Sequence, residues 1–402
     1  MLKIKHIVKK TSRTIMKKVS NRVINNEVTI FTEIGRLADK YNALKLSQGA
    51  PDINPPKWIL DIVTSEFYNG TNQYSPLEGV GEFNISVANQ YKKRYNMEVD
   101  PKSMVTTTSG ATEAIIDTIF ALVDVGDEVI IFEPFYDSYL ASIEWAGGIP
   151  VPVTMHLPDF TIDMKELKNA ITPRTKCIIV NTPHNPTGKI FSKSELEDLR
   201  DICVSNDLYL ISDEVYEYFG FFGKSHIPPA TISGLEDRTV TISSTGKTLN
   251  ATGWKIGYTI APKELTNAIR GIHQFNTFSV STPVQRGVAN VIPRFDDFVR
   301  EENLSMENRA SFLYDRVERM GLKSVKPYST YFFLSDISCV TNVNDELFIE
   351  ELIKEAKVAL IPASKFYLKS KDEGRRLIRF NFAKKMETLE EAVKRLDKFF
   401  KV

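Results

Sequence analysis

Lys247 lies in the stretch SSTGKTLNATGWKIGY, residues 243–258, directly after TVTI, a β-branched run that predicts a buried strand. Small residues surround this lysine, so the backbone could hold a ligand close to its amine. A lysine amine attacks a carbonyl carbon only when it is neutral, and burial with a nearby cation such as Lys255 would lower its pKa toward roughly 7–8. A lysine in such a setting could act as a nucleophile, whereas an ordinary surface lysine stays protonated.

The segment SGAT, residues 109–112, joins a predicted strand to a predicted helix. Its small side chains allow backbone N–H groups at the positive end of the helix to approach an anion. Ser244, Thr245 and Lys255 could add donors and positive charge, so a phosphate group would fit here. Taken alone, the segment is explained more economically as an ordinary glycine turn.

Asp213 and Glu214 follow the apolar run LYLI. An acid at the end of a buried strand needs a cationic or hydrogen-bonding partner, and a protonated ring nitrogen would serve. The alternative is that the acid caps a helix over VYEYF, residues 215–219. Tyr216, three residues after Asp213, could reach the same pocket from one helical face. Pyridoxal 5′-phosphate has the aldehyde, the phosphate and the pyridine nitrogen that these features require.

The elements expected to position these residues alternate between strands and helices. Residues 111–123 and 192–207 have helical patterns, the second beginning with a capping box at Ser192 and Glu195, and apolar runs predict strands at SMVTT (103–107), DEVIIF (127–132), CIIVN (177–181), LYLISDE (208–214) and TVTISS (239–244). Such alternation predicts an α/β fold with a mostly parallel sheet covered on both faces. Ligands bind beyond the carboxyl ends of such strands, where all the unusual segments stand.

The overall composition is that of an ordinary globular protein. The 402 residues have a formal charge of +0, so we expect no nucleic-acid partner, and no apolar run is long enough to predict a membrane span. The first 26 residues hold eight Lys and Arg and no acid, leaving 43 basic against 51 acidic residues elsewhere. We interpret residues 1–26 as a flexible basic arm, with an organelle-targeting leader as the alternative.

The cysteines and histidines do not suggest a metal centre. Cys177, Cys203 and Cys339 lie far apart and match no metal-ligand spacing. They predict buried free thiols in a reducing cytoplasm. The five histidines form neither an HxxxH nor an HExxH pattern, so a zinc hydrolase is not supported and we expect no metal.

From about residue 27 to its end, the chain resembles the class I aminotransferases of fold type I. The motifs that carry this resemblance are LSQGAPD (46–52), NQYSPLEGVGE (72–82), EPFYDSY (133–139), NTPHNPTG (181–188), SDEVYE (212–217), the stretch around Lys247 and LIRFNFAKK (377–385). They look most similar to those of the methionine, kynurenine–oxoglutarate and glutamine–phenylpyruvate transaminases. The resemblance implies pyridoxal 5′-phosphate as the cofactor and a homodimer with shared active sites.

The resemblance also implies a role for each matched residue. Lys247 would form the internal aldimine and move a proton between the substrate Cα and the cofactor C4′ atom, while Asp213 would keep the ring nitrogen protonated. Arg379 would bind the substrate carboxylate as a bidentate fork, helped by Asn185 and the Gly49 backbone. Tyr136 would stack on the cofactor ring, and Tyr216 and Asn185 would hydrogen-bond its ring oxygen. The residues implied to bind the phosphate are Gly110, Ala111, Thr112, Ser244 and Lys255, together with Tyr74 from a partner subunit.

Ordinary alternatives remain for several of these residues. Tyr136 could be a core residue, Arg379 could form a salt bridge, and His184 is better explained as shaping the backbone or the pocket rim than as a catalyst. By resemblance, the Glu133–Pro134 and Asn185–Pro186 peptide bonds are cis, and Phe278 could line the partner's pocket.

The family architecture implies a large domain at residues 60–295 with a seven-stranded, mostly parallel sheet. A smaller α+β domain would combine residues 27–59 with residues 296–402. The implied reaction moves an amino group from methionine, an aromatic amino acid or a kynurenine-like amino acid to a 2-oxo acid by a ping-pong mechanism. The alternative activity is a cysteine-S-conjugate β-lyase on the same fold. A cofactor-binding regulator is disfavoured, because residues 1–26 are too few for a DNA-binding module.

Overall fold

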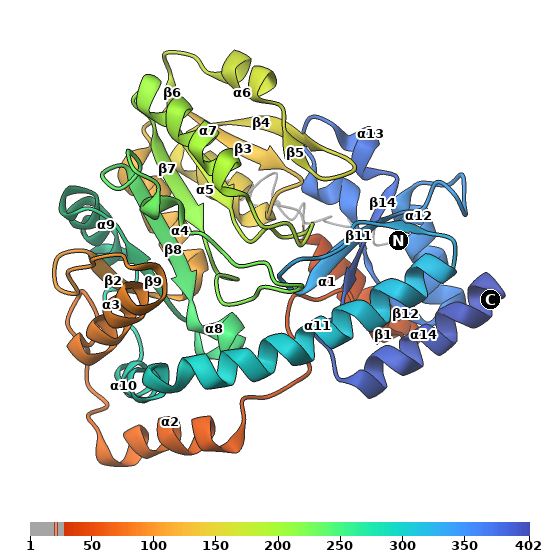
Figure 1. Cartoon of the computed structure of the whole chain (residues 1–402), viewed down its shortest axis with the longest axis horizontal. Helices are drawn as coiled ribbons and strands as arrows, with labels where there is room; N and C mark the ends of the chain where they lie inside the picture. The colour runs from red at the N-terminus through yellow and green to blue at the C-terminus, as the bar shows by residue number, and fades with distance from the viewer. Residues whose placement is uncertain (1–19, 21, 23–27) are drawn as a thin grey trace, which may run out of the picture.

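The computed structural model describes residues 20, 22 and 28–402, so the predicted basic arm lies outside the described residues apart from residues 20 and 22. The chain is built around an eight-stranded sheet in the order β2–β9–β8–β7–β6–β3–β4–β5 (Figure 1). In that order the strands are Val105–Ser109, Ile256–Ile260, Thr239–Ser244, Tyr209–Asp213, Thr175–Asn181, Glu128–Glu133, Ile149–His156 and Thr161–Ile162.

The large sheet is mostly parallel, as predicted. Strands β8, β7, β6, β3 and β4 pair in parallel, while β9 is antiparallel to both of its neighbours. The predicted number of seven strands is wrong by one. The extra strand, β5, has only two residues and folds back on the end of β4, pairing Thr161 with His156 and Ile162 with Met155. So short a strand carries no usable period of apolar residues.

Alternate residues of the central strands face different layers of helices. Val129 and Ile131 belong to one buried cluster with Ile119 of α4 and Ile269 of α9. Ile130 and its neighbours on that face pack with α6 and α7 in another cluster. The sheet is therefore covered on both sides, which explains why its strands are apolar throughout. The α-helices between residues 57 and 291 are α2 (Lys57–Asn69), α3 (Gly81–Tyr95), α4 (Gly110–Leu122), α5 (Asp137–Ala146), α6 (Met164–Ala170), α7 (Lys193–Ser205), α8 (Thr245–Thr248), α9 (Lys263–Asn276) and α10 (Thr282–Val291).

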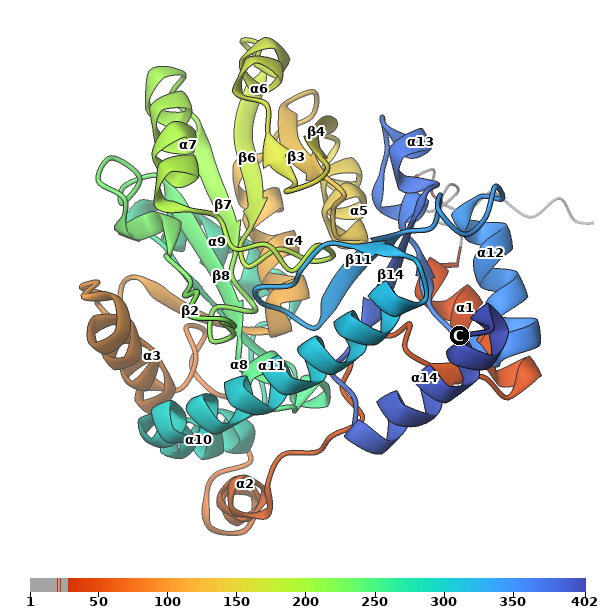
Figure 2. The same cartoon turned by 45° about the vertical axis from the view of Figure 1, so that its right-hand side comes forward.

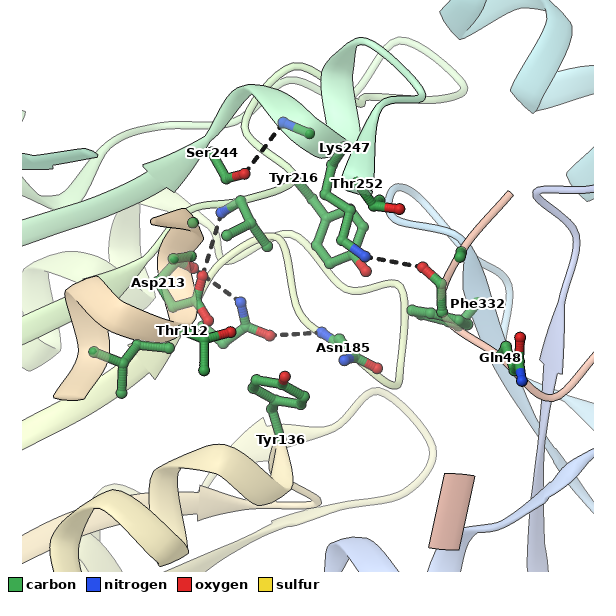
Figure 3. Close-up of a pocket in the computed structure, with 18 of the residues that line it drawn as sticks. Gln48, Thr112, Tyr136, Asn185, Asp213, Tyr216, Ser244, Lys247, Thr252 and Phe332 are labelled. Carbon is green, nitrogen blue, oxygen red and sulfur yellow. Dashed lines mark hydrogen bonds between the residues drawn. The ribbon is translucent and has the colours of Figure 1, made fainter. Parts of the chain in front are cut away.

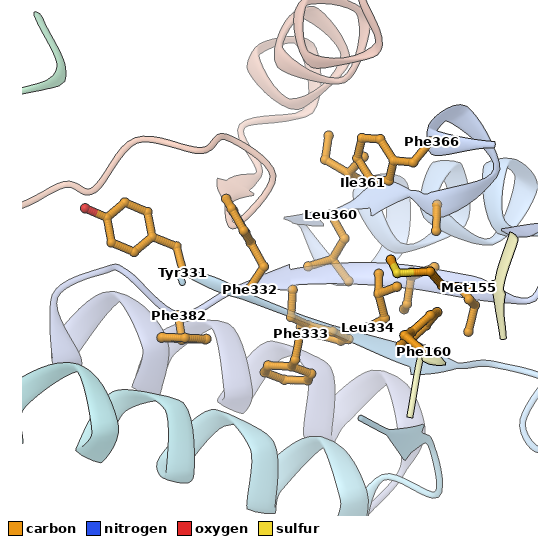
Figure 4. Close-up of a cluster of buried hydrophobic side chains, with 14 of the residues drawn as sticks. Met155, Phe160, Tyr331, Phe332, Phe333, Leu334, Leu360, Ile361, Phe366 and Phe382 are labelled. Carbon is orange, nitrogen blue, oxygen red and sulfur yellow. The ribbon is translucent and has the colours of Figure 1, made fainter. Parts of the chain in front are cut away.

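A second, antiparallel sheet is formed by the C-terminal part of the chain. Its order is β10–β11–β14–β13, with strands Lys323–Ser324, Phe332–Asp336, Leu377–Asn381 and Ile361–Pro362. Figure 4 shows Phe333 of this sheet and Phe382, the residue after β14, packed between the sheet and the helices below it. The helices of this region are α11 (Phe295–Arg319), α12 (Asp345–Glu351), α13 (Lys371–Gly374) and α14 (Met386–Phe400).

The N-terminal segment joins this C-terminal region. Strand β1 (Leu44–Lys45) pairs in parallel with β12 (Val358–Ala359), and α1 (Ile30–Tyr41) lies beside them. Figure 2 shows the long helix α11 running from α10 toward the four-stranded sheet. The domain boundaries at residues 60 and 295 remain predictions, and the second of them coincides with the beginning of α11.

Most locally predicted elements are confirmed. The helix expected at residues 111–123 is α4, and Ser192 and Glu195 form the predicted capping box of α7. The predicted strands are all observed, although β2 begins at Val105 rather than at residue 103 because the preceding residues form a turn. Both expected cis peptide bonds are present, and the Leu157–Pro158 and Thr182–Pro183 bonds are cis as well.

Two local predictions are wrong. Residues 215–218 form a turn rather than a helix, so Asp213 caps no helix and Tyr216 reaches its position from that turn. Cys339 is exposed, whereas Cys177 and Cys203 are buried as expected. It follows strand β11 in a turn, where no apolar layer covers it. Within residues 28–402, no helix has the length and apolar character needed to cross a membrane.

Candidate active site

A cavity of about 360 Å³ opens where the large sheet meets the C-terminal region (Figure 3). It lies beyond the carboxyl ends of the parallel strands, the position expected for a ligand site in this class of sheet. Tyr74 does not line it. The predicted residues that do line it are Gly49, Gly110, Ala111, Thr112, Tyr136, Asn185, Asp213, Tyr216, Ser244, Lys247, Lys255 and Arg379.

Lys247 projects into this cavity from the one-turn helix α8, which follows β8. The Ser244 hydroxyl accepts a hydrogen bond from the Gly246 N–H at 3.1 Å and caps this turn. The Lys247 Nζ atom donates to the carbonyl oxygen of Gly49 at 2.9 Å. Burial in the pocket lowers the pKa of Lys247 to about 8, with help from the positive charges of Arg379 and, to a lesser degree, Lys255. The predicted direction is therefore confirmed, but Arg379 is the more important cation.

Asp213 ends strand β7 and faces the same cavity (Figure 3). Its Oδ2 atom accepts a hydrogen bond from the Tyr139 hydroxyl at 2.5 Å, and its Oδ1 atom accepts from the Val215 N–H at 3.3 Å. Burial raises the pKa of Asp213 to about 6. Sequence reasoning missed Tyr139, although its position at the end of the motif EPFYDSY, three residues after Tyr136, was a usable signal.

The beginning of α4 forms a cradle that only small residues allow. Gly110 has a φ of +75°, and a Cβ atom at this position would lie 2.9 Å from the Lys255 Nζ atom. A Cβ atom on Gly257, opposite in β9, would lie 2.4 Å from the Gly110 carbonyl carbon. The two glycines therefore bring the helix N-terminus and the Lys255 amine close together, an arrangement suited to phosphate. Sequence reasoning did not single out Gly257.

Arg379 enters the pocket from β14 of the four-stranded sheet and is only 1% exposed. Its guanidinium donates to Asn185 Oδ1 and to the Ser47 carbonyl oxygen, each at 2.9 Å, and lies 4.0 Å from the Phe332 ring centroid. Burial lowers the pKa of this group to about 10. Among the described residues, no carboxylate lies within 4 Å of it and its Nε atom has no hydrogen-bond partner. The salt-bridge alternative is thus not observed.

Asn185 and Tyr136 both face the cavity, whereas His184 does not line it. The Asn185 N–H donates to Asn181 Oδ1 at 2.7 Å, which fixes the loop after β6. His184 is buried with its Nδ1 atom 2.8 Å from the Thr187 hydroxyl, and burial lowers its pKa to about 3. A neutral imidazole with a local partner fits the interpretation that His184 shapes the backbone.

Tyr74 lies away from the cavity on the protein surface. It is 82% exposed, and its ring packs edge-on against Phe278 with centroids 5.6 Å apart. Phe278 is 43% exposed and has a φ of +68°, a conformation that a bulky residue rarely adopts. Any contact of Tyr74 with a bound cofactor would therefore have to be made in another subunit.

The groups around the cavity fit pyridoxal phosphate. The Lys247 amine, with its lowered pKa, can react with an aldehyde. The glycine cradle and Lys255 can hold a phosphate. The buried carboxylate of Asp213 has only neutral hydrogen-bond donors within reach and would be stabilised by a protonated ring nitrogen. The buried Arg379 guanidinium has donors to spare for a carboxylate.

Comparison with known proteins agrees with this chemistry. The family described as aminotransferase class I and II matches residues 41–396, and the chain belongs to that family. It is therefore an aminotransferase, and like other class I enzymes it uses pyridoxal phosphate.

Individual relatives cover almost the whole chain. Methionine aminotransferase of Escherichia coli is 36% identical over 375 residues, covering 92% of this chain and 95% of the relative. Kynurenine–oxoglutarate transaminase 3 of Mus musculus is 34% identical and covers 93% of this chain and 89% of its own. The solved structure of N-succinyldiaminopimelate aminotransferase from Mycobacterium tuberculosis superposes with a TM-score of 0.92 at 36% identity, covering 95% and 100%.

Proposed function

We propose that this aminotransferase takes its amino group from methionine, an aromatic amino acid or a kynurenine-like L-amino acid. The observation that carries the proposal is the lining of the pocket. Arg379 is the only arginine among the described residues that line it, so within one subunit one carboxylate has a guanidinium partner and a second carboxylate has none. Phe31, Tyr136 and Phe332 supply aromatic walls. Such walls suit an apolar or aromatic side chain.

The pocket residues have separate roles in binding the substrate and in moving its proton. Bound pyridoxal phosphate supplies an electron sink for the bond that breaks at the substrate Cα. Arg379 and Asn185 bind the substrate carboxylate and orient the Cα–H bond, and Lys247, once neutral, takes that proton and returns it at C4′. Asp213 holds a proton at the ring nitrogen. Tyr216 and Asn185 donate to the ring oxygen.

The remaining pocket residues hold the cofactor in place. Tyr136 would contact its ring, and Lys255 would supply a positive charge to its phosphate. The other phosphate contacts in this proposal come from Gly110, Ala111, Thr112 and Ser244, and the Gly49 carbonyl keeps the Lys247 amine directed into the site.

The reaction runs in two halves at one site. The first amino acid leaves as a 2-oxo acid, and a second 2-oxo acid then takes up the amine. The relatives named above are all aminotransferases. No observation on this chain favours the β-lyase alternative.

We also propose that the protein acts as a homodimer. Tyr74, Phe275 and Phe278 are 82%, 86% and 43% exposed, and such grouped exposed aromatic rings typify protein interfaces. In this arrangement Tyr74 completes the partner's phosphate site. A cytoplasmic location, with three free thiols, and the division into domains at residues 60 and 295 belong to the same proposal.

A substrate panel tests the proposed donor. Methionine, phenylalanine, kynurenine, glutamine, N-succinyldiaminopimelate and aspartate would each be assayed with a 2-oxo acid acceptor. We expect kcat/KM for methionine, phenylalanine or kynurenine to exceed that for aspartate by roughly tenfold or more, because a second carboxylate would be buried without a partner. A strong preference for aspartate or N-succinyldiaminopimelate would contradict the proposal. Pyruvate release from a cysteine conjugate without an acceptor would favour the lyase.

A further inference from the structure

A buried cluster of three ionisable side chains lies directly behind the glycine cradle. Glu113 and Asp117 are one turn apart on α4, and His273 faces them from α9. The His273 Nδ1 atom lies 2.8 Å from Glu113 Oε1 and 3.5 Å from Asp117 Oδ2. All three side chains are at most 6% exposed. The cluster does not line the active-site cavity.

The other contacts of the two acids show how closely they are tied to the cradle. Glu113 Oε2 accepts a hydrogen bond from the backbone N–H of Ser109, the residue before α4. Asp117 Oδ1 accepts from Asn276 at 2.9 Å, whereas Asp117 Oδ2 has no hydrogen-bond partner among the described residues. Only the charge of His273 therefore balances this second oxygen.

The charges of this cluster affect how strongly the N-terminus of α4 can bind a phosphate. The positive end of α4 attracts any anion, so the Glu113 carboxylate in its first turn competes with a phosphate for the same field. A phosphate ester carries nearly two negative charges at neutral pH. Two uncompensated carboxylates behind the cradle would repel it. Lys255 adds positive charge on the cradle side. Arg270 of α9 instead donates hydrogen bonds to the Thr106 hydroxyl and to the carbonyl oxygens of Lys102 and Val105.

We propose that His273 is a positioning residue for the cofactor, because its imidazolium neutralises Glu113 and Asp117 and so allows the N-terminus of α4 to bind a phosphate dianion. This inference rests on the proposed use of the cradle for the cofactor phosphate. It is consistent with the charge state of the histidine. Burial alone would lower the pKa of His273, but the two adjacent carboxylates of Asp117 and Glu113 outweigh burial and raise it to about 9.

The test compares two ligands that differ only in the phosphate. Full-length apoprotein would be titrated with pyridoxal 5′-phosphate and with pyridoxal, following the quenching of protein fluorescence. In His273→Gln we expect binding of pyridoxal phosphate to weaken about fivefold to tenfold, the range for one charge near a helix N-terminus, while pyridoxal binding stays unchanged. Equal weakening for both ligands would mean a merely structural role and would overturn the inference.

Removing a negative charge from the cluster should have the opposite effect on cofactor binding to removing the positive charge of His273. Asp117→Asn takes one negative charge from the cluster, so it should strengthen pyridoxal phosphate binding about threefold and should restore most of the loss when combined with His273→Gln. Weaker binding in Asp117→Asn, or no restoration in the double variant, would contradict the proposal even if His273→Gln failed to fold. Arg270→Gln is the matched control, since it removes a cation from the same helix but faces neither acid, and its preference for the phosphorylated ligand should equal that of the wild type.

Two further outcomes separate this inference from the proposed function. If wild-type protein bound pyridoxal phosphate no better than pyridoxal, the phosphate cradle itself would be in error. If both the wild type and His273→Gln bound pyridoxal phosphate better than pyridoxal to the same degree, only the proposed role of His273 would be wrong. A stoichiometric metal ion bound by Glu113, Asp117 and His273 in purified protein would also overturn it, because a metal ion would then supply the positive charge.

Discussion

Buried charged side chains have different partners in the active-site pocket and in the core around it. Among the described residues, Lys247 and Arg379 have no carboxylate within 4 Å, and Asp213 has no basic group within that distance. The residue next to Asp213 behaves otherwise. Glu214 lies 2.6 Å from His226 Nε2 and accepts a hydrogen bond from Thr241. On the other face of the sheet, between α4 and α9, Glu113 lies 2.8 Å from His273.

The difference identifies the functional site on physical grounds. An unpaired buried charge costs free energy, and that cost is recovered when a ligand supplies the missing charge. Groups behind the pocket have partners within the chain, so they contribute to structure and to the local field. Groups in the pocket have their partners only when cofactor and substrate are bound.

The largest expected effect is from Lys247, the unpaired amine. Replacement by alanine removes the group that moves the substrate proton, so kcat should fall at least about 10³-fold. Purified Lys247→Ala should also retain no cofactor after borohydride reduction, whereas the wild type should retain one equivalent. Normal turnover in the variant would remove the basis for the proposed mechanism.

Arg379→Lys should have the next largest effect. The ammonium keeps the positive charge but loses the bidentate fork, so kcat/KM for an amino acid should fall roughly 30-fold. The control is the substrate's decarboxylated amine, which should react equally slowly with both proteins. If the loss were the same for the amine, the guanidinium would be supporting the pocket walls instead of binding the carboxylate.

The pH dependence of cofactor attachment measures how far the pocket lowers the pKa of Lys247. Only the neutral amine reacts, so the rate of attachment to apoprotein should rise about tenfold per pH unit and level off near pH 8, the pKa to which burial and Arg379 lower this group. An ordinary lysine would continue to rise to about pH 10.4. Stopped-flow absorbance between pH 6 and roughly pH 10.5 would show which limit applies.

Tyr139→Phe should have the smallest effect. Loss of the hydroxyl that donates to Asp213 removes a hydrogen bond that favours the carboxylate, so Asp213 would hold its own proton more tightly and kcat should fall about fivefold. Tyr95→Phe is the matched control, because Tyr95 donates to Glu217 at 3.3 Å behind the pocket. The control should leave kcat and the pH dependence of the cofactor absorbance unchanged.

Local patterns were sufficient for much of the fold and for most of the pocket. Residues 111–123 carry a helical period and follow Gly110, so α4 and its cradle can be predicted from sequence. The turn at residues 215–218 was misassigned because VYEYF is apolar enough for a helix, while tertiary contacts hold it as a turn. For example, the Phe219 carbonyl oxygen accepts from Ser329, a residue 110 positions away.

Local sequence patterns predict which helices and strands form and which reactive side chains follow them, because hydrophobic period and turn residues act over a few positions. Which charged side chains have partners depends on long-range packing. The Arg379 guanidinium donates a hydrogen bond to a carbonyl oxygen 332 residues away in the sequence. The Tyr139 hydroxyl donates to Asp213, 74 residues away, and His273 is hydrogen-bonded to Glu113, 160 residues away. Such pairings depend on how helices and strands pack, and no local pattern records them.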